Sequence, residues 1–189
     1  MNKLTIRSLA TLLLIIWSIG IPDAMSSDAV NLRSQPKQLF DNDVKSMLIQ
    51  FKFFDRTKNP NGDFVNDFVD NGNGTVTDRA TGLMWQKDGS PDGMMWQNAR
   101  EYVNKLNSEP FAGHSDWRLP TIEELASLMK PKKSKGHIYI DPVFSRKHDI
   151  CWSADTFGAD TAWYTSFKSG MIRHSYHFFY YVRAVRTLK

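Results

Sequence analysis

The chain of 189 residues contains one cysteine, Cys151. A single cysteine excludes an intramolecular disulfide, so the fold must be held together by the burial of apolar side chains. Cys151 stands beside Trp152 in an apolar, strand-like context, which predicts a buried and unreactive thiol. No cysteine directly follows the apolar run near the N-terminus, so the sequence offers no site for a lipid there.

Patterns that mark several classes of protein are also missing. The sequence shows no internal repeat and no heptad array. It has no nucleophile elbow around a serine, which disfavours a hydrolase triad, and no recognised motif for reading nucleic acid. We therefore expect a protein that is not an enzyme, needs no cofactor and binds no nucleic acid.

Two groups of residues resemble metal sites but lack ligands. His174 and His177 are three residues apart, which places them on opposite faces of a strand, and no cysteine or second histidine cluster completes a site. Residues 70–74 invite a calcium interpretation, yet glycines occupy the third and fifth loop positions and Thr81 replaces the bidentate glutamate. The sequence therefore predicts no metal site.

The N-terminal residues have the pattern of an export signal. Lys3 and Arg7 form a basic start, and residues 9–21 form an apolar run that is short for a membrane span. The small-residue rule favours cleavage after Ala29. We therefore predict a signal peptide over residues 1–29 and a periplasmic, extracellular or cell-surface protein that is not stably inserted in the membrane after cleavage. An uncleaved anchor is the alternative.

Removal of the signal leaves the formal net charge at +4, because the segment carries two basic and two acidic side chains. About 160 residues remain, which suffice for one domain with its own core. Residues 30–66 read as a leader with one short helix. Residues 30–38 are polar and aperiodic, so we expect poor order there. Asp41 or Asn42 is the expected N-cap of the helix, and residues 64–67 are compatible with a short strand.

Residues 67–187 form the predicted domain. Turns over residues 70–74 and 79–82 connect short early strands, and apolar side chains at helical spacing predict a helix from Trp96 to Leu106. Four late strands are predicted over residues 151–154, 161–167, 171–174 and 180–186, with a hairpin turn at 168–170. Helices between early and late strands predict an α+β single domain of antiparallel strands with two to three amphipathic helices.

The most informative stretch is residues 116–125. Thr121 and Glu124 form a capping box, in which the hydroxyl and the carboxylate satisfy backbone N–H groups at the start of a helix. Pro120 prevents that helix from beginning earlier.

Three blocks, residues 77–85, 116–125 and 181–186, together resemble the Lcl C-terminal domain family. The resemblance implies a C-type-lectin-like fold. Residues 118–121, with the acidic helix that follows, are similar to the same element in formylglycine-generating enzymes. The resemblance implies little about the ligand, because one fold hosts many activities.

The chain also departs from these relatives. Met95 stands where the family's second helix usually opens with Thr or Ser, so this helix should start less firmly. Formylglycine-generating enzymes rely on paired active-site cysteines, and lectins of this fold commonly bind calcium through Glu-Pro-Asn or similar triplets. This chain has neither. Oxidase chemistry and a calcium-dependent sugar site therefore do not carry over.

Asp116, Arg118, Arg183 and Arg186 are predicted to form a buried charge network, since arginine forks match carboxylates and a desolvated arginine must find partners. A ligand carboxylate or phosphate is the alternative partner. The residues that receive a structural role in the motif blocks are Asp78, Trp85, Asp116, Trp117, Arg118, Thr121, Glu124, Arg183 and Arg186.

Two groups of side chains are candidates for ligand contact. Trp163 and Tyr164 are adjacent on a predicted strand, so one points inward and the other outward, and sugars stack on aromatic faces. Lys132, Lys133 and Lys135 form a basic loop suited to sulfated or phosphorylated polymers, with a solvated loop as the alternative. Most of the tryptophans are expected in the core.

These observations predict an exported, non-enzymatic binding or adhesion module for a glycan, an anionic polymer or another envelope protein. The alternative is an envelope enzyme or accessory factor with a pocket near Asp116 and Arg118. A deep pocket with converging ionisable groups would favour the enzyme, whereas a shallow aromatic or basic face would favour the binding module.

Overall fold

The computed structural model describes residues 29–134 and 137–188. The predicted signal peptide lies outside the described residues, apart from Ala29. The described part of the chain contains no helix that is both long and apolar enough to cross a membrane.

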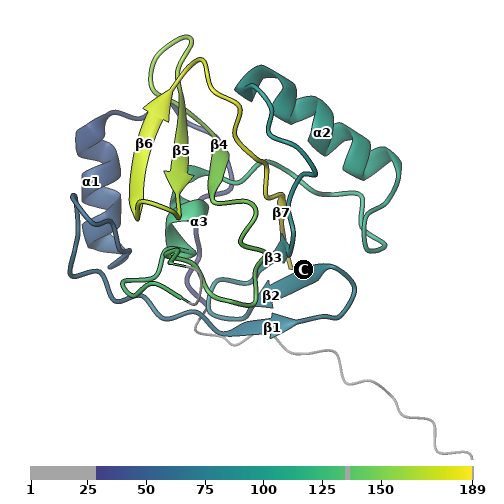
Figure 1. Cartoon of the computed structure of the whole chain (residues 1–189), viewed down its shortest axis with the longest axis horizontal. Coiled ribbons are helices and arrows are strands. Elements are labelled where there is room, and N and C mark those ends of the chain that lie inside the picture. The colour runs from purple at the N-terminus through teal and green to yellow at the C-terminus, as the bar shows by residue number, and fades with distance from the viewer. Residues whose placement is uncertain (1–28, 135–136, 189) are drawn as a thin grey trace, which may run out of the picture.

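The described residues form three helices and seven strands, which confirms the predicted α+β class. In chain order they are α1 (Asp41–Gln50), β1 (Phe68–Asp70), β2 (Thr75–Asp78), β3 (Leu83–Gln86), α2 (Trp96–Ser108), α3 (Ile122–Ser127), β4 (Ile150–Thr156), β5 (Ala162–Ser166), β6 (Met171–Ser175) and β7 (Val185–Thr187). Figure 1 places α1 and α2 on opposite sides of the molecule, with strands β4, β5 and β6 between them.

The strands form two antiparallel sheets, one in the order β1-β2-β3-β7 and one in the order β4-β5-β6. The predicted turns join β1 to β2, β2 to β3 and β5 to β6. The predicted late strand over residues 180–186 is wrong for residues 180–184, because the strand there is Val185–Thr187. Residues 176–184, which we call the crossing segment, pass between the two sheets. In this segment the Tyr181 carbonyl accepts from the Trp152 N–H (2.9 Å), and the Ala184 carbonyl accepts from the Gln86 N–H (2.9 Å).

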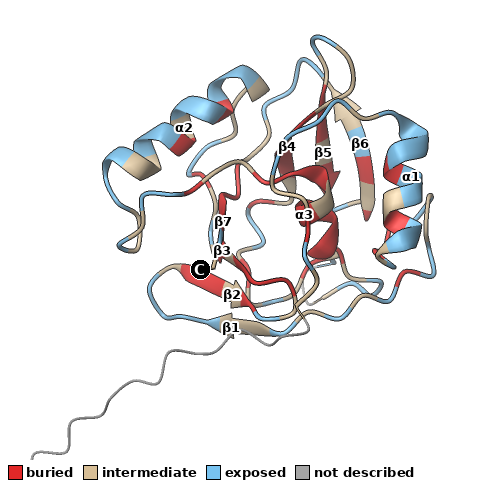
Figure 2. Cartoon of the chain, turned by 180° about the vertical axis from the view of Figure 1, so that it is seen from behind, coloured by how far each residue is buried: buried red, intermediate tan, exposed pale blue. Residues whose placement is uncertain are grey.

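The main core lies between α1, α3 and the inner face of the β4-β5-β6 sheet, and Figure 2 shows α3 largely buried at its centre. Alternation along β4 and β5 sends Cys151, Trp163 and Thr165 inward, where each is buried. A smaller cluster lies beneath α2 and contains Ala99, Val103, Trp117, Val182 and Ala184.

The segment before β1 is packed against the domain, so the expectation of poor order in residues 30–38 is wrong. Leu32 is buried, and the Val30 N–H donates to the Ala80 carbonyl (2.8 Å). The predicted α1 is present, but it begins at Asp41, so neither Asp41 nor Asn42 is its N-cap. Residue 40 holds that position, and the carboxylate of Asp43 accepts from its N–H (2.8 Å). The short strand also lies later than expected, at Phe68–Asp70.

One buried carboxylate explains why the leader is ordered. Asp155 on β4 is fully buried and receives both arms of the Arg33 guanidinium, each at 2.8 Å. It also accepts from the backbone N–H of Lys37 (2.7 Å) and of Ile122, the first residue of α3 (2.7 Å). A bidentate arginine pair with two further donors meets the requirement that a buried charge be paired and hydrogen-bonded. Asp155 therefore joins the leader, α3 and the second sheet.

We expect Asp155→Ala to lower the free energy of unfolding by about 3 kcal/mol, because it leaves the largely buried Arg33 without its anion. Urea unfolding followed by circular dichroism measures this. Asp160→Ala, at an exposed acidic position near the end of β4, is the matched control and should unfold like the unchanged protein. Equal midpoints for both variants would refute the assigned role.

Candidate functional site

The predicted capping box is present at the start of α3. The Thr121 hydroxyl accepts from the Glu124 N–H (3.2 Å), and the Glu124 carboxylate accepts from the Thr121 N–H (2.8 Å). Glu124 is fully buried and also receives both arms of Arg118, at 2.7 and 2.5 Å. Arg118 is therefore the counter-ion of the capping carboxylate.

The four charged residues predicted to form one network are divided among three places, so that prediction is wrong in its details. Arg186 pairs with Asp116 through two hydrogen bonds (2.6 and 3.1 Å), while Arg118 pairs with Glu124 instead of Asp116. Arg183 is fully buried and has no carboxylate within salt-bridge distance among the described residues. The sequence does not reveal which charged residues pair, because the pairs depend on how separate segments of the chain are placed in the fold.

Arg183 binds backbone carbonyls instead of an acid. Its guanidinium donates to the carbonyls of Gln86 (2.8 Å), Lys87 and Ser145 (3.2 Å), and it lies over the Phe144 ring at 4.8 Å. Burial lowers the pKa of Arg183. The residue ties the loop after β3 to the crossing segment, so its role is structural.

Asp78 and the tryptophans of the motif blocks are structural as well. The Asp78 carboxylate accepts from the Thr81 hydroxyl (2.8 Å) and so holds the turn between β2 and β3. The indole of Trp117 donates to the Phe111 carbonyl (3.1 Å). The tryptophans at 85, 117, 152 and 163 are all buried, as expected for most of them.

Trp163 is not a contact residue, because it is fully buried on the inner face and its indole donates to the Leu39 carbonyl (3.1 Å). Tyr164 points to the opposite face and is half-buried. The prediction that one of this pair points inward and the other outward is confirmed. Tyr164 is the one that a ligand can reach.

Strand register builds a row of side chains on the outer face of the second sheet. Tyr164 lies opposite Trp152 on β4 and opposite Arg173 on β6. Tyr180, from the crossing segment, packs over this row, with its ring centroid 4.7 Å from that of Trp152 and 4.6 Å from that of Tyr164. The ring of Phe178 stacks on Tyr180 at 5.5 Å. We call these five residues the aromatic face.

Large aromatic side chains next to the aromatic face are exposed to solvent. Phe178 is 55% exposed, and its neighbours Phe179 and Tyr176 are 70% and 55% exposed. Single exposed apolar residues are ordinary, but several large ones together mark an interaction surface. Sequence reasoning missed Phe178 and Phe179. The signal was available as a run of aromatic residues at 176–181 that continues past the end of a predicted strand.

The basic loop lies elsewhere. Lys132 and Lys133 are exposed, and the ammonium of Lys133 lies 5.3 Å from the Tyr139 ring, whereas Lys135 lies outside the described residues. This loop lies near the end of β5, because the Tyr139 N–H donates to the Phe167 carbonyl just after that strand. The aromatic run follows β6, whose last residue, Ser175, pairs with Ala162 at the start of β5. The lysines and Tyr164 therefore do not form one site.

Two hollows, of about 340 and 510 Å³, adjoin each other between α2 and the leader. They share Pro36, Arg100, Leu119 and Ala154, and Arg118 lines the smaller one. Asp116 does not line either hollow. The Arg118 guanidinium is hydrogen-bonded to Glu124, so these two hollows do not bring together the unpaired acidic and basic side chains that an active site would need.

Cys151 is not poised for chemistry. Its thiol is fully buried and donates to the His148 carbonyl (3.7 Å), and burial raises its pKa to about 11. Burial lowers the pKa of His148, which keeps its ring neutral. Within residues 29–134 and 137–188, no cluster of three or more His, Cys, Asp or Glu side chains could hold a metal ion.

A comparison with family models matches residues 74–186 to the Lcl C-terminal domain. This span includes the capping box, both strands that carry Trp152 and Tyr164, and the aromatic run. No curated protein matches the chain.

Arg118→Ala should lower the free energy of unfolding by about 3 kcal/mol, because Glu124 would remain buried without its cation. Thermal unfolding measures the loss. Arg100→Ala, at an exposed arginine on α2, is the matched control. A variant at position 118 that melts like the control would show that Arg118 is available to a ligand.

The thiol of Cys151 should not react with a thiol reagent such as 5,5′-dithiobis(2-nitrobenzoate) at pH 8 in the native protein, because it is buried and its pKa is about 11. In guanidinium chloride one equivalent should react. Rapid labelling of the native protein would contradict the burial.

Proposed function

The chain belongs to the Lcl C-terminal domain family, and from this premise we propose that it is an exported, non-enzymatic binding module that takes a glycan on the aromatic face. The observation that carries the proposal is the surface formed by Tyr164, Arg173, Tyr180 and Phe178, which the fully buried Trp152 supports from beneath. Flat apolar rings beside a hydroxyl match the alternating apolar and polar faces of a sugar.

The ligand we propose carries acidic groups. Arg173 is exposed at the edge of the row, where its guanidinium donates to the thioether of Met171 (3.1 Å). The fork of an arginine suits a carboxylate or sulfate, and stacking on the neighbouring tyrosine suits the sugar ring that bears it. Burial raises the pKa of Tyr180, so its hydroxyl stays protonated as a donor at neutral pH.

We propose a C-type-lectin-like arrangement for the fold. Two features support it. The last strand, β7, returns to pair with β3, so late and early segments share one sheet. Residues 118–121 lead into a short acidic helix, as in the similar element of formylglycine-generating enzymes.

Export is part of the proposal and rests on the basic start and apolar run at the N-terminus. It places the binding face in the periplasm or on the cell surface, where glycans and other envelope proteins are the available partners. The basic loop at Lys132 and Lys133 offers a second, weaker route to anionic polymers.

The enzyme alternative has less support. Near Asp116 and Arg118 both charged groups are engaged in ion pairs, with Arg186 and Glu124 respectively. Neither is therefore free to transfer a proton or hold a reacting group.

A glycan array probed with the mature domain at low and moderate salt tests the proposal. We expect binding to acidic glycans that falls about tenfold in Tyr164→Ala, because a stacked ring is lost, and in Phe178→Ala. Lys132→Ala/Lys133→Ala should bind normally.

Phe40→Ala is the matched control, since Phe40 is 54% exposed but lies at the start of α1. Melting temperatures of all variants confirm that they are folded. Binding lost only in the double lysine variant would move the site to the basic loop, and no binding to any glycan would refute the proposed ligand.

A further inference from the structure

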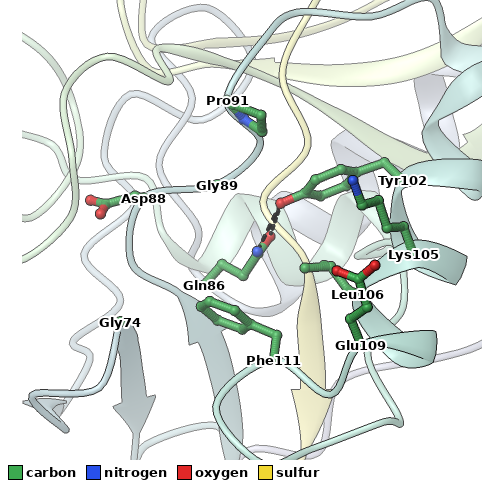
Figure 3. Close-up of a pocket in the computed structure, with 10 residues that line it drawn as sticks. All are labelled: Gly74, Gln86, Asp88, Gly89, Pro91, Tyr102, Lys105, Leu106, Glu109 and Phe111. Atoms are coloured by element: carbon green, nitrogen blue, oxygen red, sulfur yellow. Dashed lines mark hydrogen bonds between the residues drawn. The ribbon is translucent and has the colours of Figure 1, made fainter.

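A third hollow, separate from the aromatic face, lies between α2 and the loop that follows β3. Its volume is about 450 Å³, which falls within the range of small-molecule sites. We call it the β3–α2 hollow. Figure 3 shows its lining residues, which are Gly74, Gln86, Asp88, Gly89, Pro91, Tyr102, Lys105, Leu106, Glu109 and Phe111.

The polar floor of this hollow is a hydrogen-bonded pair whose donors can be assigned. The Ala184 N–H can only donate, and it donates to Gln86 Oε1 (3.0 Å). The amide nitrogen of Gln86 therefore donates to the Tyr102 oxygen (2.8 Å), as Figure 3 shows. Burial raises the pKa of Tyr102, so the hydroxyl keeps its proton. The Tyr102 hydroxyl also lies 3.2 Å from Gln86 Oε1, to which it donates, so an acceptor in the hollow would receive its hydrogen in place of this longer contact.

Two opposite charges line the hollow beside this donor. Tyr102 and Lys105 are three residues apart on one face of α2, and Glu109 is the residue that caps the C-terminal end of that helix. Figure 3 shows them along the same wall, with Asp88 on the opposite wall. Among the residues that the structure describes, the side chains of Lys105 and Glu109 have no ion pair with each other or with any other residue. Both are available to a ligand.

The rest of the lining is apolar. Leu106 lies beside Glu109, Phe111 lies near Gln86 at the lower end of the view, and Pro91 lies at the upper end. The Gly74 backbone approaches so closely that a Cβ there would lie 3.2 Å from the Phe111 ring. Phe111 is in turn held by an edge contact with Trp117, at 5.6 Å between ring centroids. The hollow therefore combines an apolar base with one cation (Lys105), two anions (Glu109 and, on the opposite wall, Asp88) and one hydroxyl.

We propose that the β3–α2 hollow binds a zwitterionic α-amino acid with an apolar side chain. Its carboxylate is held by the Lys105 ammonium and the Tyr102 hydroxyl, its ammonium by the Glu109 carboxylate, and its side chain by Leu106 and Phe111. Both ionic groups of the ligand must be present, because one alone leaves either Lys105 or Glu109 without its partner. This site is independent of glycan binding at the aromatic face.

Isothermal titration calorimetry with three related compounds tests the proposal. L-Phenylalanine carries both charges, phenethylamine lacks the carboxylate, and 3-phenylpropionate lacks the ammonium. We expect phenylalanine to bind at least tenfold more tightly than either analogue. Lys105→Gln and Glu109→Gln should each remove most of that preference, and Tyr102→Phe should weaken phenylalanine severalfold.

Glu101→Gln is the matched control, because Glu101 is exposed on the outer face of α2. It should bind phenylalanine as the unchanged protein does, and the melting temperature of each variant shows whether it is folded. Equal affinity for the three compounds would overturn the proposal by showing a purely apolar hollow. No heat of binding for phenylalanine at millimolar concentration would overturn it as well. Glycan binding by the same preparation is a separate readout, so the two proposals fail independently.

Discussion

The contacts of Asp155 are the constraint on which much of the structure depends. A fully buried carboxylate is tolerated only when its charge and its lone pairs are matched, and here Arg33, Lys37 and Ile122 match them from two distant segments. The leader, the start of α3 and the edge of the second sheet therefore meet at one side chain. Because the start of α3 is fixed there, its capping carboxylate Glu124 is buried as well. Arg118 then pairs with that buried carboxylate.

Side chains alternate between the two faces of the β4-β5-β6 sheet, so one face forms part of the core and the other forms part of the surface. Its inner face buries Cys151, Trp163 and Thr165 against α1 and α3. Its outer face carries Trp152, Tyr164 and Arg173, which the crossing segment partly covers with Tyr180. The sheet thus fixes Trp152, Tyr164 and Arg173, and Tyr180 packs against them, which lowers the entropy that this part of the surface loses on binding. The β3–α2 hollow uses the other sheet, so the two proposed sites share little structure.

Arg183 illustrates the limit of reasoning from residue types. An arginine in a family motif invites a carboxylate partner, yet this one donates to three backbone carbonyls and lies over an aromatic ring, and its Nε has no hydrogen-bond partner among the described residues. Carbonyl groups at the end of a strand and in a loop are invisible in a sequence pattern. Their convergence depends on the crossing segment, which was itself predicted as a continuous strand. The error in the strand and the error in the partner expected for Arg183 therefore have one cause.

Local patterns in the sequence determined the α+β class, the turns between neighbouring strands, the capping box and the burial of the tryptophans, because each depends on residues a few positions apart or on overall apolarity. The sequence also determined that Trp163 and Tyr164 face opposite ways, since alternation is a property of any strand. Only the tertiary structure decided which of the two reaches solvent, that the polar leader is ordered by Asp155, and that Phe178 joins Tyr164. These depend on contacts between segments as many as 124 residues apart, which no local pattern encodes.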